Sequence, residues 1–156
     1  MKENMRKFKK ISDYPDTWGV SQGKLDGKPI FIRYREGLKD AIGHTDYPFQ
    51  IGVATPLLQP TQDGLTGDAE SVQLNVIEDG LADVLNQTGD TVHVMTITFN
   101  GMREFVFYTK EWKPEDFERK VKTVKEIIKA GHQLQFMMQP DENWETFKKY
   151  FPTPAN

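Results

Sequence analysis

Five residues of the kinds that bind polar ligands or move protons occur on three segments with the pattern of neighbouring β-strands. Arg33 and Arg35 belong to the first segment, His93 to the second, and Glu104 and Tyr108 to the third. An imidazole beside a phenol can relay a proton, and guanidinium and carboxylate groups hold small polar ligands. These five residues form the candidate ligand-binding site. On this hypothesis the chain is an enzyme or a small-ligand-binding protein.

A structural interpretation of the same residues is favoured. Glu104 is expected opposite Ile97, and a carboxylate among apolar neighbours requires a cationic partner. Arg33 or Arg35 would supply that partner, and the ion pair would fix an N-terminal hairpin against the sheet. His93 is expected opposite Tyr108, as a hydrogen-bonded structural pair.

Other kinds of site find little support in the residue types. The chain has no cysteine, which excludes disulfides, thiolate nucleophiles and cysteine-bound zinc or iron–sulfur centres. His44 and Asp46 lie two residues apart in a predicted loop, a spacing more typical of a polar loop than of a metal site. Phosphate-loop, dinucleotide-binding and metalloprotease motifs are absent. We therefore predict no metal and no cofactor.

The central element is predicted to be a hairpin of residues 91–99 and 102–109. It turns at Asn100-Gly101, because a type I′ turn needs positive φ at both central positions. The turn sets the register, and the predicted opposed pairs on one face are Phe99 with Met102, Ile97 with Glu104, Met95 with Val106, and His93 with Tyr108. On the other face the pairs are Thr98 with Arg103, Thr96 with Phe105, Val94 with Phe107, and Val92 with Thr109.

Further strands and helices surround this hairpin. Residues 18–22 and 29–35 flank a Leu25-Asp26-Gly27 turn, and residues 49–55 and 132–139 alternate as strands do. Residues 68–87 have helical periodicity, with Asp68 as N-cap, Val72 and Val76 in the apolar stripe, and Glu70 and Glu78 on the polar side. A second helix begins at Pro114 and ends at Gly131, and a short C-terminal helix carries Trp144, Phe147 and Tyr150.

The order of these elements predicts an α+β fold. Residues 48–139 give strand, helix, strand, strand, helix, strand, which is the ferredoxin-like (split βαβ) order of an antiparallel sheet with both helices on one face. The N-terminal hairpin and the short C-terminal helix would extend or cover that sheet. We expect one domain over residues 17–151, preceded by a basic tail over residues 1–16.

Both faces of the predicted central hairpin are apolar, so more than the two helices must cover the sheet. The N-terminal hairpin, the segment around Trp144 or a second subunit would provide the additional cover. The net charge is −3, which disfavours nucleic acid as a partner, and no apolar run is long enough to span a membrane. We expect a cytoplasmic protein.

Several of these residues carry a resemblance to a known family. Residues 103–109 (REFVFYT) after Gly101, residues 141–144 (DENW), and Trp18 with residues 27–29 (GKP) resemble the domain of unknown function 695 family over about residues 17–151. The resemblance implies no activity, cofactor or catalytic residue. Some members of that family lie beside a domain similar to protein inhibitors of ribonuclease E, which implies a regulatory or protein-binding role.

The favoured hypothesis is therefore a small non-catalytic α+β domain that binds a protein partner or another copy of itself. It depends on the two apolar faces of the sheet and on the lack of a recognisable catalytic constellation. The enzyme or small-ligand hypothesis requires Arg33, Arg35, His93, Glu104 and Tyr108 to converge in one pocket.

Overall fold

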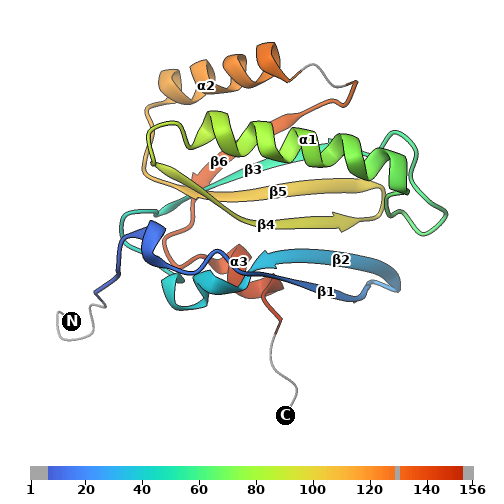
Figure 1. The fold of residues 1–156 in the computed structure, drawn as a ribbon, viewed down its shortest axis with the longest axis horizontal. Helices are drawn as coiled ribbons and strands as arrows, with labels where there is room; N and C mark the ends of the chain where they lie inside the picture. Colours follow the sequence, from blue (N-terminus) through green and yellow to red (C-terminus); the bar gives the residue numbers. More distant parts are fainter. Residues whose placement is uncertain (1–6, 129–130, 153–156) are drawn as a thin grey trace.

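A six-stranded antiparallel sheet forms the centre of the protein, in a computed structural model that describes residues 7–128 and 131–152 (Figure 1). The strand order is β1-β2-β4-β5-β3-β6. The strands are β1 (Trp18–Leu25), β2 (Lys28–Arg35), β3 (Phe49–Pro56), β4 (Thr91–Phe99), β5 (Met102–Thr109) and β6 (Gln135–Pro140). The predicted α+β class is confirmed. The N-terminal hairpin extends the sheet, because β2 pairs with β4, and the sheet therefore has two strands more than a ferredoxin-like sheet.

Two turns of the same chemistry shape the hairpins. Asn100 and Gly101 have φ of 52° and 81°, and Asp26 and Gly27 have φ of 54° and 79°. These left-handed conformations suit Gly, Asn and Asp, and they match the twist of the flanking strands. The predicted register beside the Asn100-Gly101 turn is confirmed, including the pairing of Ile97 with Glu104.

The register changes farther from the turn. A β-bulge between His93 and Met95 makes His93 pair with Phe107, and Val92 pair with Tyr108. The predicted pairs of His93 with Tyr108, Val92 with Thr109 and Val94 with Phe107 are therefore wrong. An extra residue in one strand shifts all later pairs by one position, and a shift of one position moves a side chain to the opposite face.

Helices α1 (Asp68–Leu85) and α2 (Pro114–Ile127) cover one face of the sheet (Figure 1). The buried side chains Leu74, Ile77 and Leu81 of α1 pack in a core cluster with residues of β3 and β5. Val72 and Val76, predicted in that stripe, are each 65% exposed, and the N-cap of α1 is Gly67 instead of Asp68. The predicted end of the second helix at Gly131 is wrong, because α2 ends at Ile127 and its C-cap Ile128 has an extended backbone.

The opposite face is covered by shorter elements. The helix α3 (Glu145–Tyr150) and the 3₁₀ helices η2 (Ile11–Asp13) and η3 (Glu36–Ala41) contribute to a second core cluster, which includes Trp144 and Phe147. Trp144 precedes α3 with φ of 55°, and its indole N–H donates to the carbonyl of Tyr47 over 2.9 Å. Among the described residues, no helix is long and apolar enough to cross a membrane.

Candidate functional site

Arg33 and His93 belong to one polar cluster between β2, β4 and α1. The guanidinium of Arg33 forms an ion pair with Glu78 of α1, and it lies 4.4 Å from the ring centroid of Trp18. Thr96 Oγ1 donates to Glu78 Oε1 over 2.7 Å, and His93 Nε2 lies 2.9 Å from the same hydroxyl oxygen. The helix-facing side of the sheet therefore holds these two candidate residues together.

The ionisation of this cluster follows from burial and from the pairing of its charges. Burial lowers the pKa of His93 to about 4, although the charge of Glu78 acts in the opposite direction. Burial by itself would raise the pKa of Glu78, but His93, Thr96 and Arg33 lower it below its ordinary value. At neutral pH the cluster thus holds an ionised Glu78 paired with Arg33 beside an uncharged His93. Its polar groups bond to one another and fix the hairpin β1–β2 against α1.

Arg35 lies near this cluster but bonds to a different segment. Its guanidinium donates to the carbonyls of Tyr14 and Pro15 at 3.1 and 3.2 Å, and it lies 3.6 Å from the carboxylate of Asp16. Burial lowers its pKa, while Asp16 opposes that change. Arg35 thereby ties the segment before β1 to the edge of the sheet.

Tyr108 faces the other side of the sheet, because the bulge separates it from His93. Its hydroxyl donates to Asp141 Oδ2 over 2.7 Å, and its ring stacks on Trp144 with centroids 4.3 Å apart. Burial and the neighbouring carboxylate of Asp141 raise the pKa of Tyr108. The phenol is therefore a fixed hydrogen-bond donor beneath α3.

Glu104 also faces the α3 side, and no cationic group in the described part of the chain pairs with it. The predicted pairing with Arg33 or Arg35 is wrong, because Arg33 lies on the helix-facing side with Glu78, and Arg35 pairs with Asp16. No ion pair reaches Glu104 from any residue in the ranges 7–128 and 131–152. Burial raises the pKa of its carboxyl group.

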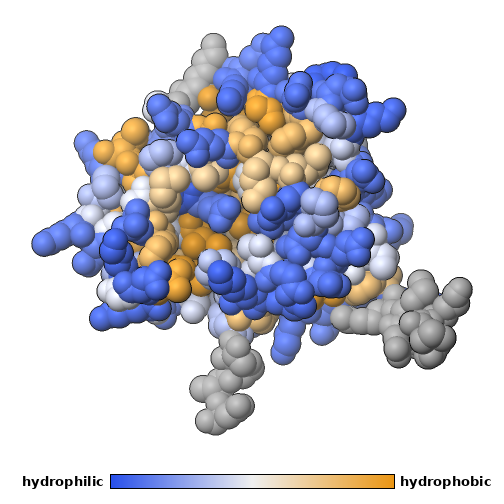
Figure 2. All heavy atoms as spheres, turned by 180° about the vertical axis from the view of Figure 1, so that it is seen from behind, coloured by the Kyte–Doolittle hydropathy of each residue, from blue (hydrophilic) through white to orange (hydrophobic). Residues whose placement is uncertain are grey.

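The Glu104 pocket is a concave region of about 220 Å³ near the β4–β5 turn, on the α3 side of the sheet. It is lined by Leu25, Ile30, Ile97, Phe99, Asn100, Met102, Glu104 and Tyr150. Figure 2 shows the molecule from the side opposite to Figure 1, with apolar side chains gathered near the middle of this view and hydrophilic groups among them. An acidic group on an apolar wall is the distinctive chemistry of this pocket.

Small residues of β3 provide the room for this carboxylate. Ala54 pairs directly with Glu104, and Gly52 is the next residue on the same face of β3. A Cβ atom on Gly52 would lie 3.0 Å from Glu104 Oε2 and 3.5 Å from the terminal carbon of Met137. The carboxylate therefore lies over the backbone of Gly52, beside Met137 of β6.

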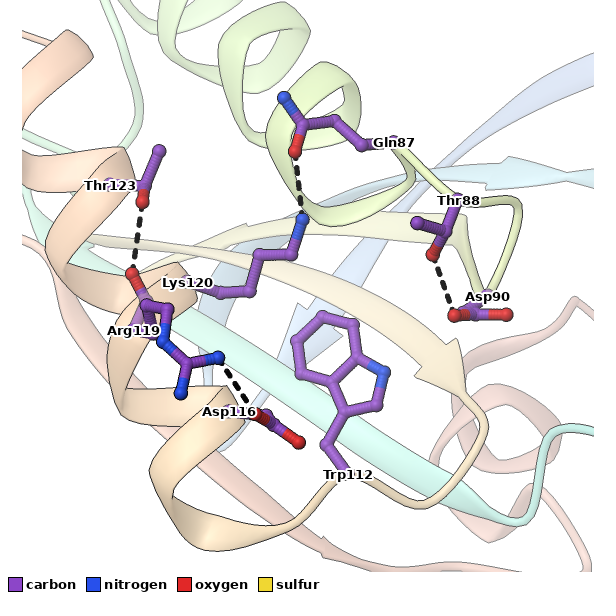
Figure 3. Close-up of a pocket in the computed structure, with 8 residues that line it drawn as sticks. All are labelled: Gln87, Thr88, Asp90, Trp112, Asp116, Arg119, Lys120 and Thr123. Atoms are coloured by element: carbon purple, nitrogen blue, oxygen red, sulfur yellow. Dashed lines mark hydrogen bonds and ion pairs between the residues drawn. The ribbon is translucent and has the colours of Figure 1, made fainter.

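A different concave region of about 410 Å³ lies between the end of α1 and the start of α2 (Figure 3). Its lining residues are Gln87, Thr88, Asp90, Trp112, Asp116, Arg119, Lys120 and Thr123. Lys120 donates to Gln87 Oε1 and to the carbonyl of Val84, and Arg119 donates to Asp116. The basic groups of this region thus bond within the protein itself, whereas Glu104 has no ion-pair partner among the residues that the structure describes.

Two buried carboxylates were misplaced by sequence reasoning. Glu70 and Glu78 were expected on the polar side of their helix, yet Glu70 is 5% exposed and the side chain of Glu78 is 12% exposed. Glu70 accepts hydrogen bonds from the backbone N–H groups of Leu58 and Gln59, and His132 Nε2 lies 2.7 Å from its Oε2. The available signal was helical spacing, because Glu70 is four residues before the buried Leu74 on the same side of α1, and Glu78 lies at the border of that side.

The structure does not bring the five predicted residues into one pocket. Arg33 and His93 share a cluster with Arg35 nearby, while Glu104 and Tyr108 lie separately on the other side of the sheet. Their role in ligand binding stays a prediction. Within residues 7–128 and 131–152, no group of three or more His, Asp or Glu side chains is arranged to hold a metal ion.

Comparison with known proteins adds a family without an assigned activity. The model of a family of unknown function, DUF695, matches residues 16–151. No curated protein matches the chain. The match spans every strand and helix described above except the 3₁₀ helix η2.

Proposed function

Because this chain belongs to the family of unknown function DUF695, we propose its function from its own residues: it is a non-catalytic module that binds a protein partner through the Glu104 pocket. The observation that carries the proposal is the combination of an apolar concave wall with a carboxylate that no cation of the described residues neutralises.

The chemistry of the pocket suits a protein surface. Met102 lines the pocket with the buried residues Ile30 and Ile97 and is 36% exposed, and Met137, 39% exposed, lies beside Gly52 next to the Glu104 carboxylate. Methionine side chains adapt to different partners, and burial of such apolar area on binding contributes about 25 cal/mol per Å². Aromatic and methionine side chains are also enriched at the centres of protein–protein interfaces. These properties favour a protein partner for this face.

The absence of catalysis is part of the same proposal. His93, Glu78 and Tyr108 have the perturbed pKa values that often mark active sites, but each of them bonds to neighbouring residues in a structural network. A network of this kind shifts pKa values without chemistry. The supporting observation is that Arg33 and Tyr108, at the two ends of the predicted site, face opposite sides of the sheet.

Three finer assignments belong to the proposal. We class β3 to β6 with their two helices as ferredoxin-like, which the order β4-β5-β3-β6 supports, with β1–β2 as an added hairpin. We take residues 17–151 as one domain after the basic segment 1–16, which packs on that domain through Ile11 and Tyr14. We also place the protein in the cytoplasm with no membrane partner and no nucleic-acid partner, and the net charge of −3 supports the last of these.

A site-specific crosslink tests the interaction. The photo-crosslinking amino acid p-benzoylphenylalanine replaces Met102 in cells of the source organism, and replaces Val72 of α1, 65% exposed, as the matched control. We expect a discrete protein adduct from position 102 that is absent from position 72 and is lost when Met137→Asp is added. An adduct of twice the chain mass would identify the partner as a second copy. Identical adducts from both positions, or none from position 102, would contradict the proposal.

A further inference from the structure

The partner class follows from the unpaired carboxylate, on the assumption that the Glu104 pocket is the binding surface proposed above. We infer that the partner inserts a lysine or arginine side chain, whose aliphatic stem packs on the apolar wall and whose cationic head pairs with Glu104.

No cation of residues 7–128 or 131–152 pairs with Glu104. Lys28 lies on the same face of β2 as Ile30, but its ammonium donates to Asn100 Oδ1 over 3.1 Å. Arg33 is held by Glu78 on the other side of the sheet. A half-buried carboxylate without a partner has lost part of its hydration without compensation. A cation supplied from outside the chain would restore that lost interaction.

The shape of the pocket suits a long basic side chain. The carboxylate lies over Gly52 at one side of the pocket, and Ile97, Ile30 and Met102 line the apolar wall. Lysine and arginine combine an aliphatic stem of three or four methylene groups with a charged head. Tyr150 of α3 also lines the pocket, and its ring already contacts a cation of the chain, because the ammonium of Lys149 lies 5.1 Å from the ring centroid.

Other occupants fit the charge less well. An anionic group would be repelled by Glu104, and a wholly apolar side chain would bury the carboxylate further without a partner. A neutral polar side chain could donate a hydrogen bond to the carboxylate, but it would leave the negative charge of Glu104 without a counter-charge, which a lysine or arginine supplies together with the hydrogen bond. Charge complementarity therefore selects a basic side chain.

A titration with two matched peptides tests this inference on the full chain. The probes are acetyl-Ala-Leu-Arg-Leu-Ala-amide and the same peptide with citrulline in place of arginine, which keeps the stem and the hydrogen-bonding shape but removes the charge. Binding is followed by backbone amide chemical shifts of the ¹⁵N-labelled protein. We expect saturable shifts at Gly52, Ile97 and Met102, and about tenfold or greater weakening of binding for the citrulline peptide.

The variant Glu104→Gln completes the comparison. It should weaken binding of the arginine peptide to the level of the citrulline peptide, and it should leave binding of the citrulline peptide unchanged. Glu118→Gln, a change of an exposed glutamate in α2, is the matched control and should alter neither affinity. Circular dichroism spectra and unfolding curves establish that both variants fold.

Two results would overturn the inference. Equal binding of both peptides to the natural protein would show that charge is not recognised, and the absence of shifts at millimolar arginine peptide would show that the pocket takes no basic side chain. The Met102 crosslink distinguishes this failure from that of the proposed function. If the adduct persists undiminished in a Glu104→Gln background, the protein interaction stands and the basic side chain does not.

Discussion

The buried carboxylate of Glu70 joins three separate segments, and its replacement by glutamine should destabilise the fold strongly. Glu70 is in the first turn of α1 and is 5% exposed. It accepts from the N–H groups of Leu58 and Gln59 after β3, and it bonds to His132 in the segment before β6. The change Glu70→Gln keeps the side-chain volume, so the experiment measures the lost acceptor and the lost charge without a cavity.

The expected magnitude follows from the three hydrogen bonds. The amide of glutamine has one acceptor oxygen where the carboxylate has two, so at least one buried backbone N–H loses its acceptor, which costs about 1–3 kcal/mol. The remaining bonds lose the charge on their acceptor and weaken by about 1 kcal/mol each. The total is about 3–5 kcal/mol, or a fall in Tm of roughly 6–20 °C for a domain of this size.

Urea unfolding at neutral pH, followed by tryptophan fluorescence, measures this loss. Glu118→Gln, an exposed change in α2, should remain within about 0.5 kcal/mol of the natural protein. Burial alone would raise the pKa of Glu70, but the bonds from Leu58, Gln59 and His132 lower it. The stabilisation should therefore be complete above the pKa of an unfolded glutamate, about 4.3, and be lost as the pH falls through the lower folded value. If Glu70→Gln unfolds at the urea concentration of the control, the reasoning is refuted.

Three further predictions concern the polar networks. Since burial lowers the pKa of His93 to about 4, its imidazole should stay neutral down to that pH in an NMR titration. The unfolded state then binds this proton more tightly, so the free energy of unfolding should fall as the pH drops from about 6.5 to about 4. The fall should be smaller in the variant His93→Gln. Tyr108→Phe removes the donor to Asp141 and should cost about 1–2 kcal/mol in urea unfolding, and a cost near zero would contradict the buried bond. Arg33→Met leaves Glu78 without its ion pair and should lower the free energy of unfolding by about 1–2 kcal/mol, because Arg33 is a third exposed. In a double-mutant cycle with Glu78→Gln the two losses should not add, and strictly additive losses would exclude the ion pair.

The parts of the fold that local chemistry determines could be predicted from the sequence. The two-residue turn at Asn100-Gly101 requires positive φ at both positions. The bounds of β4 and β5 are the same as the predicted ranges, 91–99 and 102–109. The pairing of Ile97 with Glu104 follows from the same turn. The unusual position of Glu104 among apolar neighbours was therefore visible before the structure.

The bulge in β4 was not visible, and it changed the candidate site most. Val92, Val94 and Met95 are all apolar, and so are residues on both faces of β5, so a shift of one residue leaves an equally apolar pattern. Only the packing of α1 and α3 on the two faces selects the register. His93 thereby pairs with Phe107, away from Tyr108.

Partners that are distant in the sequence were also beyond local reasoning. A helical wheel places Glu70 within the buried side of α1 and Glu78 at its border, but their partners His132 and Arg33 are 62 and 45 residues away along the chain. The expected cation for Glu104 was wrong for a related reason. Arg33 lies on the helix-facing side of β2, and the alternation of a strand gives the two faces without identifying which one meets a helix.

The pKa of the Glu104 carboxyl group tests the central claim most directly, because it reports whether this group is half-buried and unpaired in solution. Side-chain carboxyl resonances of the ¹³C-labelled protein, followed through an acid titration, give this pKa. The structure predicts a pKa above the ordinary glutamate value of about 4.3, raised by burial, and a decrease when the arginine peptide is bound. A pKa at or below the ordinary value in the free protein would mean that water or a cation of the chain already stabilises the carboxylate, and would contradict a pocket that selects a basic side chain.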